Sequence, residues 1–225
     1  PADTLEEAQQ NKLRHIAAKL DLKPGQRVLD IGCGWGGMAI YLAQNFDVHV
    51  TGVTLSKEQL ALAQQRAEQL GLAHKISFEF KDYRDVAGTF DRIVSIGMFE
   101  HVGISYFQQY FGKIQSLLAP GGVALVHAIG RKGGPGTTGK WLRKYIFPGG
   151  YSPALSQIVP AVEGAWLWIT DIEVLRLHYA YTLKAWYDRC AVQEDAITAL
   201  YDARFYRMWS SIWRRRGAPL PMMAI

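Results

Sequence analysis

An apolar run that breaks into glycines constrains this chain more than any other feature. Residues 27–31 (RVLDI) have the pattern of a buried strand, and residues 32–37 (GCGWGG) follow it at once. Glycines let the chain turn tightly and let backbone N–H groups approach a ligand at the start of a helix, here expected at residues 38–45. The glycines recur at every second residue, which is tighter than a dinucleotide fingerprint, and no P-loop lysine follows. The pattern predicts a cradle for a nucleotide-like ligand, although such a turn also serves simply to pack a helix on a strand.

Strand patterns and helix patterns alternate over the first 130 residues. A capping box, with Thr4 as the N-cap and Glu7 three residues later, begins a helix that runs to about Leu20. Later strands are expected at residues 48–54, 76–80, 91–96 and 122–129, with helices at residues 56–70 and 106–118. This order is typical of an α/β fold with a doubly wound, mostly parallel sheet and helices on both faces.

Polar and unusual residues gather where these strands end. They are the glycines after the first strand, Thr54 to Ser56 after the second, Asp82 and Tyr83 after the third, Glu100 and His101 after the fourth, and His127 near the end of the fifth. Parallel strands end at the same edge of a sheet, and ligands of such sheets bind in the crevice there. Five strand ends therefore converge on one candidate site.

The composition changes after Gly130. Residues 131–140 form a basic, glycine-rich loop, and six of the seven tryptophans lie at or after Trp141. So many aromatic side chains in an appended segment indicate a lid or the wall of an apolar pocket, although each alone is as well explained as core for additional helices. A long helix is expected at residues 171–190, with Thr170 and Glu173 as its capping box.

Length, charge and cysteine content limit the class of protein. A chain of 225 residues, 49% of them hydrophobic, is long enough for one sizeable core. A formal net charge of +5 suits an anionic membrane surface, though many enzymes are as basic, and no nucleic-acid partner is expected. The two cysteines, Cys33 and Cys190, form no disulfide framework and indicate a reducing compartment such as the cytoplasm. No signal peptide, bilayer-spanning run or metal-ligand spacing is found, so no bound metal is expected.

Six motifs together resemble one known family. They are residues 30–37 (DIGCGWGG), 52–59 (GVTLSKEQ), 82–85 (DYRD), 98–103 (MFEHVG), 145–150 (YIFPGG) and 178–183 (HYAYTL). In combination they are similar to the cyclopropane-fatty-acid synthases over roughly residues 1–208, whereas the glycine motif alone marks only the wider class I S-adenosylmethionine-dependent methyltransferases. The resemblance implies a Rossmann-like class I methyltransferase fold with an added helical, aromatic-rich lid segment.

The resemblance also implies a reaction. The methyl group of S-adenosylmethionine adds to the cis double bond of an unsaturated phospholipid acyl chain, and loss of a proton closes a cyclopropane ring. The base that the family implies is bound bicarbonate, and its binding residues correspond to Cys33, Glu100, His127, Ile129 and Tyr179. The residue types agree, with backbone N–H groups of Cys33 and Ile129 as donors and Glu100 as an acceptor. Cys33, His127 and Tyr179 also have ordinary packing explanations, whereas a buried carboxylate is harder to explain by structure alone.

Cofactor contacts follow from the same resemblance. It implies backbone contacts from Gly32, Gly34 and Gly36, with Thr54, Leu55 and Gln59 near the ribose and Asp82 and Tyr83 near the adenine. Gln59 also lies three residues after Ser56, so it serves equally well to complete a capping box.

The chain is expected to be a single methyltransferase catalytic domain over residues 1–225. Residues 1–130 would form the cofactor-binding core, residues 131–209 the acyl-substrate and lid segment, and residues 210–225 an atypical tail. Residues 210–221 show neither a strand alternation nor a sustained helical stripe, where the family would add a helix and a final sheet strand. The resemblance also implies an N-terminal stretch that folds over the cofactor, and residues 1–225 are expected not to include it. An uncovered sheet edge would favour self-association, for which a homodimer is the simplest form.

Rival functions remain open from the motifs alone. The same scaffold serves lipid C-methyltransferases that close no ring and N-methyltransferases that act on small amines. An inactive fragment that still binds the cofactor is the third alternative. Peripheral contact with an anionic membrane is favoured by the basic loop and the aromatic segment.

Overall fold

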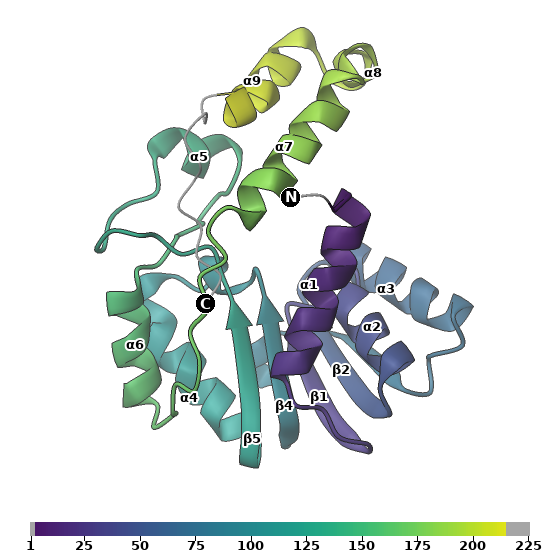
Figure 1. Ribbon diagram of the computed structural model, residues 1–225, viewed down its shortest axis with the longest axis vertical. Helices are drawn as coiled ribbons and strands as arrows, with labels where there is room; N and C mark the ends of the chain where they lie inside the picture. The colour runs from purple at the N-terminus through teal and green to yellow at the C-terminus, as the bar shows by residue number, and fades with distance from the viewer. Residues whose placement is uncertain (1–2, 215–225) are drawn as a thin grey trace.

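The computed structural model describes residues 3–214 of the chain. Within them, five parallel strands form one sheet in the order β3-β2-β1-β4-β5 (Figure 1). The strands are β1 (Gln26–Ile31), β2 (Val48–Thr54), β3 (Ile76–Phe80), β4 (Phe90–Ile96) and β5 (Leu118–His127). The chain builds outward from β1 to β3 and then crosses to β4, so the strand order reverses between β1 and β4. Such a switch point leaves a crevice at the carboxyl ends, and the predicted α/β fold is confirmed.

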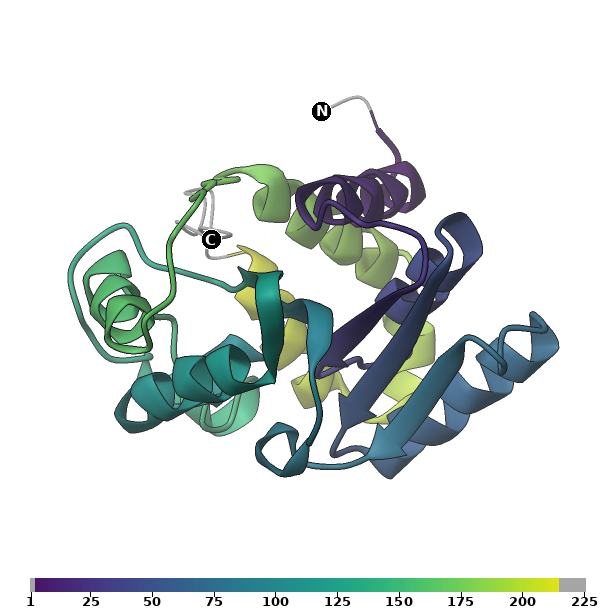
Figure 2. The same cartoon turned by 90° about the horizontal axis from the view of Figure 1, so that it is seen from below.

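Helices cover both faces of the sheet. On one face lie α1 (Leu5–Lys19), α2 (Gly37–Asn45) and α3 (Lys57–Gln69), and on the other lie α4 (Phe107–Leu117) and α6 (Leu155–Gly164) (Figures 1 and 2). Each of the helices predicted before residue 130 begins and ends within one residue of its expected position.

Helix α1 is anchored at both of its ends. The Thr4 hydroxyl accepts the N–H of Glu7 at 3.2 Å, and the Glu7 carboxylate accepts the N–H of Thr4 at 2.7 Å, which confirms the capping box. At the other end, the buried guanidinium of Arg92 in β4 donates to the carbonyl groups of Leu20 and Asp21. The capping box fixes the start of α1, and the bonds from Arg92 hold the end of α1 against β4.

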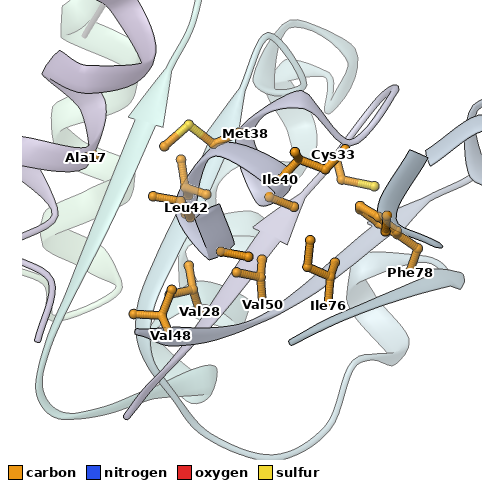
Figure 3. Packing of buried hydrophobic residues seen from close by; sticks show 14 of the residues in the cluster. Ala17, Val28, Cys33, Met38, Ile40, Leu42, Val48, Val50, Ile76 and Phe78 are labelled. Carbon is orange, nitrogen blue, oxygen red and sulfur yellow. The ribbon is translucent and has the colours of Figure 1, made fainter. Parts of the chain in front are cut away.

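Successive residues of the central strands enter two separate cores. Val28 packs with α1, α2 and α3, while its neighbour Leu29 packs with α4 and α6 on the opposite face. Figure 3 shows the first core, in which Val28, Val48 and Val50 of β1 and β2 lie beneath Leu42 of α2. Burial on both faces explains why these strands read as continuous apolar runs.

A helical upper segment lies beyond the carboxyl ends of the strands (Figure 1). It contains α5 (Lys140–Tyr145), α7 (His178–Ala191), α8 (Glu194–Leu200) and α9 (Ala203–Arg214), and the last three pack on one another. Helices α5, α7 and α8 contain no fully buried residue. No helix in residues 3–214 is long and apolar enough to cross a membrane.

The helix predicted at residues 171–190 begins later than expected. Helix α7 starts at His178, and the Thr170 and Glu173 capping box does not form. Instead, Glu173 accepts hydrogen bonds from His15 at 2.6 Å and Lys19 at 2.9 Å, and Asp171 pairs with Lys19. The acidic residues that resemble a helix start are therefore used in tertiary contacts with α1, and the prediction was wrong there.

Two other boundaries differ from the sequence expectation. Strand β5 starts at Leu118, because this residue pairs with Phe90 before a register shift, and it ends at His127 rather than at residue 129. Helix α9 continues through residues 210–214, where no helical stripe was expected. The rest of the atypical tail, residues 215–225, lies outside the described residues.

Candidate active site

The glycine turn after β1 has the backbone conformation that its sequence predicts. Gly32, Gly34 and Gly36 have φ angles of 76°, 54° and 80°, in the left-handed region that glycine adopts without strain. The N–H of Gly36 donates to the carbonyl of Cys33 at 3.0 Å, and Gly36 is also the N-cap of α2. The turn therefore leads directly from the end of β1 into the start of a helix.

The three glycines differ in what surrounds them. A Cβ atom on Gly32 would lie 2.7 Å from Cγ of Met98, and one on Gly36 would lie 2.8 Å from the ring of Phe78. At Gly34, no heavy atom except those of its chain neighbours lies within 4 Å of the Cβ position. Gly32 and Gly36 are thus required for packing, whereas Gly34 leaves the space that a ligand at the end of β1 needs.

The residues after β2 bond to one another. Thr54 Oγ1 donates to Oε1 of Gln59 at 3.1 Å and accepts the N–H of Ser56 at 3.2 Å. Ser56 caps α3 by accepting the N–H of Gln59, but the Gln59 side chain bonds Thr54 rather than Ser56, so the capping box is incomplete. Leu55 is 64% exposed. Contact of Thr54, Leu55 and Gln59 with a ribose stays a prediction.

The residues after β3 already have protein partners. The Asp82 carboxylate accepts two hydrogen bonds from the Arg84 guanidinium, at 2.9 and 2.6 Å, and this cation holds the pKa of Asp82 below its usual range. Tyr83 packs edge-on against Tyr110, with 5.4 Å between the ring centroids. Their contact with an adenine ring also stays a prediction.

Glu100 is the buried acid of this site. It lies in the short helix η2 (Phe99–His101) after β4 and is 6% exposed. Its Oε1 accepts the N–H of Ile129 at 2.6 Å, while its Oε2 is buried without a hydrogen-bond partner among the described residues. Burial raises the pKa of Glu100, and the bond from Ile129 opposes this effect. Because a buried oxygen without a donor is unfavourable, Oε2 is suited to accept a hydrogen bond from a ligand.

His127 and Tyr179 are the other two side chains of the predicted site: His127 precedes Ile129, which bonds Glu100, by two residues, and Tyr179 feels the charge of Glu100. His127 ends β5, and its Nδ1 atom is buried with no hydrogen-bond partner in residues 3–214. Burial lowers the pKa of His127 and the charge of Lys12 lowers it further, so the imidazole is neutral at pH 7. Tyr179 lies in the first turn of α7. Burial raises the pKa of Tyr179, and the charge of Glu100 raises it further. The structure therefore brings together polar groups from two strand ends and from the upper segment.

Two backbone donors expected to bind an anion are already occupied. The N–H of Cys33 donates to the carbonyl of Val53 at 3.0 Å, and the N–H of Ile129 donates to Glu100. This corrects the expectation that both groups bond an anion directly, because they fix the glycine turn and the Glu100 carboxylate instead. Burial and the charge of Asp30 raise the pKa of the Cys33 thiol to about 12. The thiol is therefore protonated at neutral pH and packs in the core (Figure 3).

Sequence reasoning missed two charged groups near the site. Asp30 in β1 is 2% exposed, its Oδ2 has no partner among the described residues, and burial raises its pKa to about 7. Lys12 of α1 is half-buried and near enough to His127 to lower its pKa. Both residues could have been found from the sequence. Asp30 is an acid inside an apolar strand, and Lys12 lies one turn before Ile16 on the buried face of a helix.

A pocket in the upper segment lies between α5 and α9. It encloses about 430 Å³ and is lined by Trp141, Tyr145, Asp202, Arg204, Phe205, Met208 and Ser211. Four of these side chains are aromatic or apolar, which agrees with the pocket wall expected for this segment. Trp166 and Trp168 are not part of it, since they are 91% and 94% exposed.

Comparison with known families gives a match over nearly the whole chain. Residues 1–215 match the family described as mycolic acid cyclopropane synthetase. Over 209 residues the chain is 46% identical to the cyclopropane-fatty-acyl-phospholipid synthase of Escherichia coli strain K12, which covers 93% of this chain and 53% of that protein. The chain thus spans about half the length of this curated relative.

Solved structures of two cyclopropane synthases have the same fold. The cyclopropane synthase MmaA2 from Mycobacterium tuberculosis has a TM-score of 0.87 and 31% identity, over 95% of this chain and 80% of that chain. The mycolic acid cyclopropane synthase CmaA1, complexed with SAH and CTAB, has a TM-score of 0.86 and 30% identity, over 94% of this chain and 79% of that one. The glycine turn, the parallel sheet and these matches identify a class I S-adenosylmethionine-dependent methyltransferase fold, and the chain belongs to the mycolic acid cyclopropane synthetase family.

Proposed function

We propose that this chain transfers a methylene bridge from S-adenosylmethionine to the cis double bond of an unsaturated phospholipid acyl chain, which forms a cyclopropane ring. The observation that carries the proposal is the buried Glu100 carboxylate, whose Oε2 has no partner in the described residues and whose Oε1 bonds Ile129, two residues after the neutral His127. Family membership supports the same reaction, because the relative from E. coli is named as a cyclopropane-fatty-acyl-phospholipid synthase.

The glycine turn is the proposed cofactor cradle. When bound, S-adenosylmethionine supplies the methyl group. The open space at Gly34 and the start of α2 beside it fit such a ligand, and the SAH complex of CmaA1 supports the assignment. The proposed side-chain contacts are Thr54, Leu55 and Gln59 toward the ribose and Asp82 and Tyr83 toward the adenine.

An alkene is a weak nucleophile, so the site has to orient the reactants and then accept a proton. We assign the role of base to bound bicarbonate, as the family implies. Neutral His127 and the Tyr179 hydroxyl would donate to this anion, and Oε2 of Glu100 would accept its hydroxyl hydrogen. Cys33 and Ile129 act indirectly, because their N–H groups hold the glycine turn and Glu100 in place.

The upper segment is the proposed binding region for the lipid. Residues 1–130 would hold the cofactor and residues 131–209 the acyl chain, with the aromatic pocket between α5 and α9 as its apolar surface. The exposed cations Lys140, Arg143 and Lys144 of α5 would dock this cytoplasmic protein on an anionic leaflet. In residues 3–214, β5 pairs only with β4, so its free edge is the proposed contact of a homodimer.

Product analysis with lipid vesicles tests the proposal. The purified chain is incubated with S-adenosylmethionine and vesicles of cis-unsaturated phosphatidylglycerol, and S-adenosylhomocysteine release is measured with and without bicarbonate. We expect release that stops in bicarbonate-free buffer and returns when bicarbonate is added back. Mass spectrometry and NMR of the lipid should show a gain of one CH2 group and a cyclopropane ring.

Different products would contradict different parts of the proposal. A methyl branch without a ring would identify a lipid C-methyltransferase, and turnover of small amines instead of vesicles would identify an N-methyltransferase. Ring formation at full rate without bicarbonate would overturn the assigned base and leave the substrate assignment intact. Cofactor binding without any turnover would indicate an inactive fragment.

A further inference from the structure

Lys12 lies on the face of α1 that packs against the sheet. It precedes Ile16 by one helical turn and Leu20 by two, and both of those residues are buried in the core. Figure 1 shows the N-terminal half of α1 near the carboxyl ends of β4 and β5 and beside the first turn of α7. The position of Lys12 therefore directs it toward the site rather than toward the outer surface of the helix.

The Lys12 side chain is half-buried. Among the described residues it makes no side-chain hydrogen bond or ion pair, whereas Lys19 on the same helix pairs with Asp171 and Glu173. Burial lowers the pKa of Lys12, which means that its charged form is poorly solvated. Withdrawing an ammonium group from water without a partner is unfavourable, so a ligand that neutralises it would stabilise this position.

The surrounding charges favour an anion as that ligand. Lys12 acts on His127, whose imidazole is neutral, while the nearby acids of the site are Glu100 and Asp30. An anion bound beside His127 would be repelled by the ionised form of these carboxyl groups. A cation within a few ångströms offsets such repulsion most strongly where the surroundings are poor in water.

We propose that Lys12 is an anion-binding residue of this site, whose ammonium group pairs with a carboxylate-type anion next to His127. The inference rests on the proposed function, which brings two such anions to the site: bicarbonate and the carboxylate of the methionine part of S-adenosylmethionine. Both present a planar pair of oxygens that share a negative charge, which is the chemistry that an ammonium group recognises.

Isothermal calorimetry on matched variants tests the proposal without relying on turnover. Lys12→Met keeps the length and packing of the side chain and removes its charge, while Lys12→Arg keeps the charge. Arg14→Met is the control, since Arg14 is an exposed residue of the same helix that bonds the side chain of Asn11. Each variant is titrated with S-adenosylmethionine, with its decarboxylated analogue, and with bicarbonate in the presence of S-adenosylhomocysteine.

We expect Lys12→Met to lose about tenfold or more in affinity for one of the two anions, and Lys12→Arg and Arg14→Met to stay near wild type. A loss toward S-adenosylmethionine but not toward its decarboxylated analogue identifies the methionine carboxylate. A loss toward bicarbonate alone identifies bicarbonate. Unchanged affinity for both anions in a folded Lys12→Met protein overturns the inference.

A second measurement covers the case in which Lys12→Met does not fold. The Nζ resonance of Lys12 in the wild-type protein is followed by NMR while each anion is added, and a shift that saturates with binding is expected. No shift with either anion overturns the inference. Because these readouts concern binding, a chain that binds its ligands but leaves lipids unchanged would contradict the proposed function and leave the role of Lys12 intact.

Discussion

The sheet with its covering helices and the upper segment are held together in different ways. In the sheet, Leu29 and Ile93 are fully buried between helices on both faces. In the upper segment, α5, α7 and α8 contain no buried residue, and large aromatic side chains such as Trp141 and Tyr145, which contact each other within α5, stay exposed. Burial of apolar side chains therefore stabilises the sheet more than the upper segment, and local opening of the upper segment should cost less free energy than opening of the sheet.

The contacts between the two regions include several exposed ion pairs on α1. Glu6 pairs with Arg189 at 2.8 Å, and Glu173 accepts from His15 at 2.6 Å. Exposed pairs of this kind contribute roughly 0–1 kcal/mol each. Glu100 lies just after β4 and His127 at the end of β5, whereas Tyr179 lies in α7 of the upper segment. Movement of the upper segment would therefore separate Tyr179 from Glu100 and His127. Such an opening suits a site that admits a bulky lipid.

The largest expected effect comes from Glu100 on the sheet side of the site. Glu100→Gln keeps an oxygen for the N–H of Ile129 but removes the charge, so turnover should fall by about 1,000-fold while cofactor affinity stays within about threefold. Tyr179→Phe, in α7 of the upper segment, should lower turnover by about 10- to 100-fold. S-adenosylhomocysteine release and calorimetry measure both quantities. Equal losses of turnover in Glu100→Gln and Tyr179→Phe would mean that the sheet side and the upper segment contribute equally to the site.

The core of the sheet and the exposed stretch between α6 and α7 should differ next in stability. Ile93→Ala opens a cavity at a fully buried position of β4 and should lower the free energy of unfolding by about 2–5 kcal/mol. Trp168→Ala removes a larger side chain that is 94% exposed, so the change should stay within about 0.5 kcal/mol. Urea unfolding curves of both variants provide the measurement. A comparable loss for Trp168→Ala would mean that this tryptophan is covered in solution.

The pH dependence of stability should follow the buried groups of the sheet. Burial raises the pKa of Asp30 to about 7, above its unfolded value, so the stability it confers is complete below about pH 4 and is lost as the pH rises through 7. His127 acts in the opposite direction: its lowered pKa means that stability is lost as the pH falls below about 6.5.

Asp30→Asn isolates the first of these two effects. Denaturation of the cofactor-free proteins measures the free energy of unfolding at each pH. Relative to wild type, this free energy should rise for the variant by a few kcal/mol between pH 5 and pH 8. The same comparison for Glu58→Asn on the exposed face of α3 should give a flat difference over this range, because that carboxylate has a lowered pKa and is ionised throughout. Parallel curves for Asp30→Asn and wild type would show that Asp30 is better solvated than its burial indicates.

The smallest effect concerns the outer face of the upper segment. Replacing Lys140, Arg143 and Lys144 with glutamine should weaken binding to anionic vesicles by about 1 kcal/mol per cation, and added salt should reduce the difference. Arg131, in the same basic stretch, is excluded because its guanidinium donates to the carbonyl of Ser152 at 3.0 Å. Vesicle co-sedimentation measures the effect, with neutral vesicles as the control. Equal binding to neutral and anionic vesicles at low salt would argue against electrostatic docking.

The sheet was predictable from the sequence to a degree that the upper segment was not. Strands such as β2 and β3 were predicted residue for residue, because apolar runs between turn residues report burial on both faces. The start of α7 was mispredicted, because Asp171 and Glu173 look like helix-start residues and their pairing with α1 is a tertiary contact. Local patterns lose their predictive power where packing is sparse and long-range polar contacts decide the conformation.

The sequence predicted which residues belong to the candidate site better than it predicted their hydrogen-bond partners. The glycine turn and Glu100 stood out because their residue types are unusual next to buried strands. The partner of a backbone N–H group leaves no trace in residue type, so the bond from Cys33 to Val53 was not foreseen. Lys12 was missed because a lysine on a helix is usually solvated, and only the packing of α1 shows which way it faces.

The bond from Ile129 to Glu100 sets an unusual rule for sequence variation at position 129. The side chain takes no part in this bond, since the backbone N–H is the donor. Substitutions among apolar residues, and many polar ones, should therefore leave the carboxylate in place. Proline is the residue that lacks this hydrogen. Within homologous sequences, this functional position would be recognised by the one residue type that never occurs there, and a search for invariant side chains would overlook it.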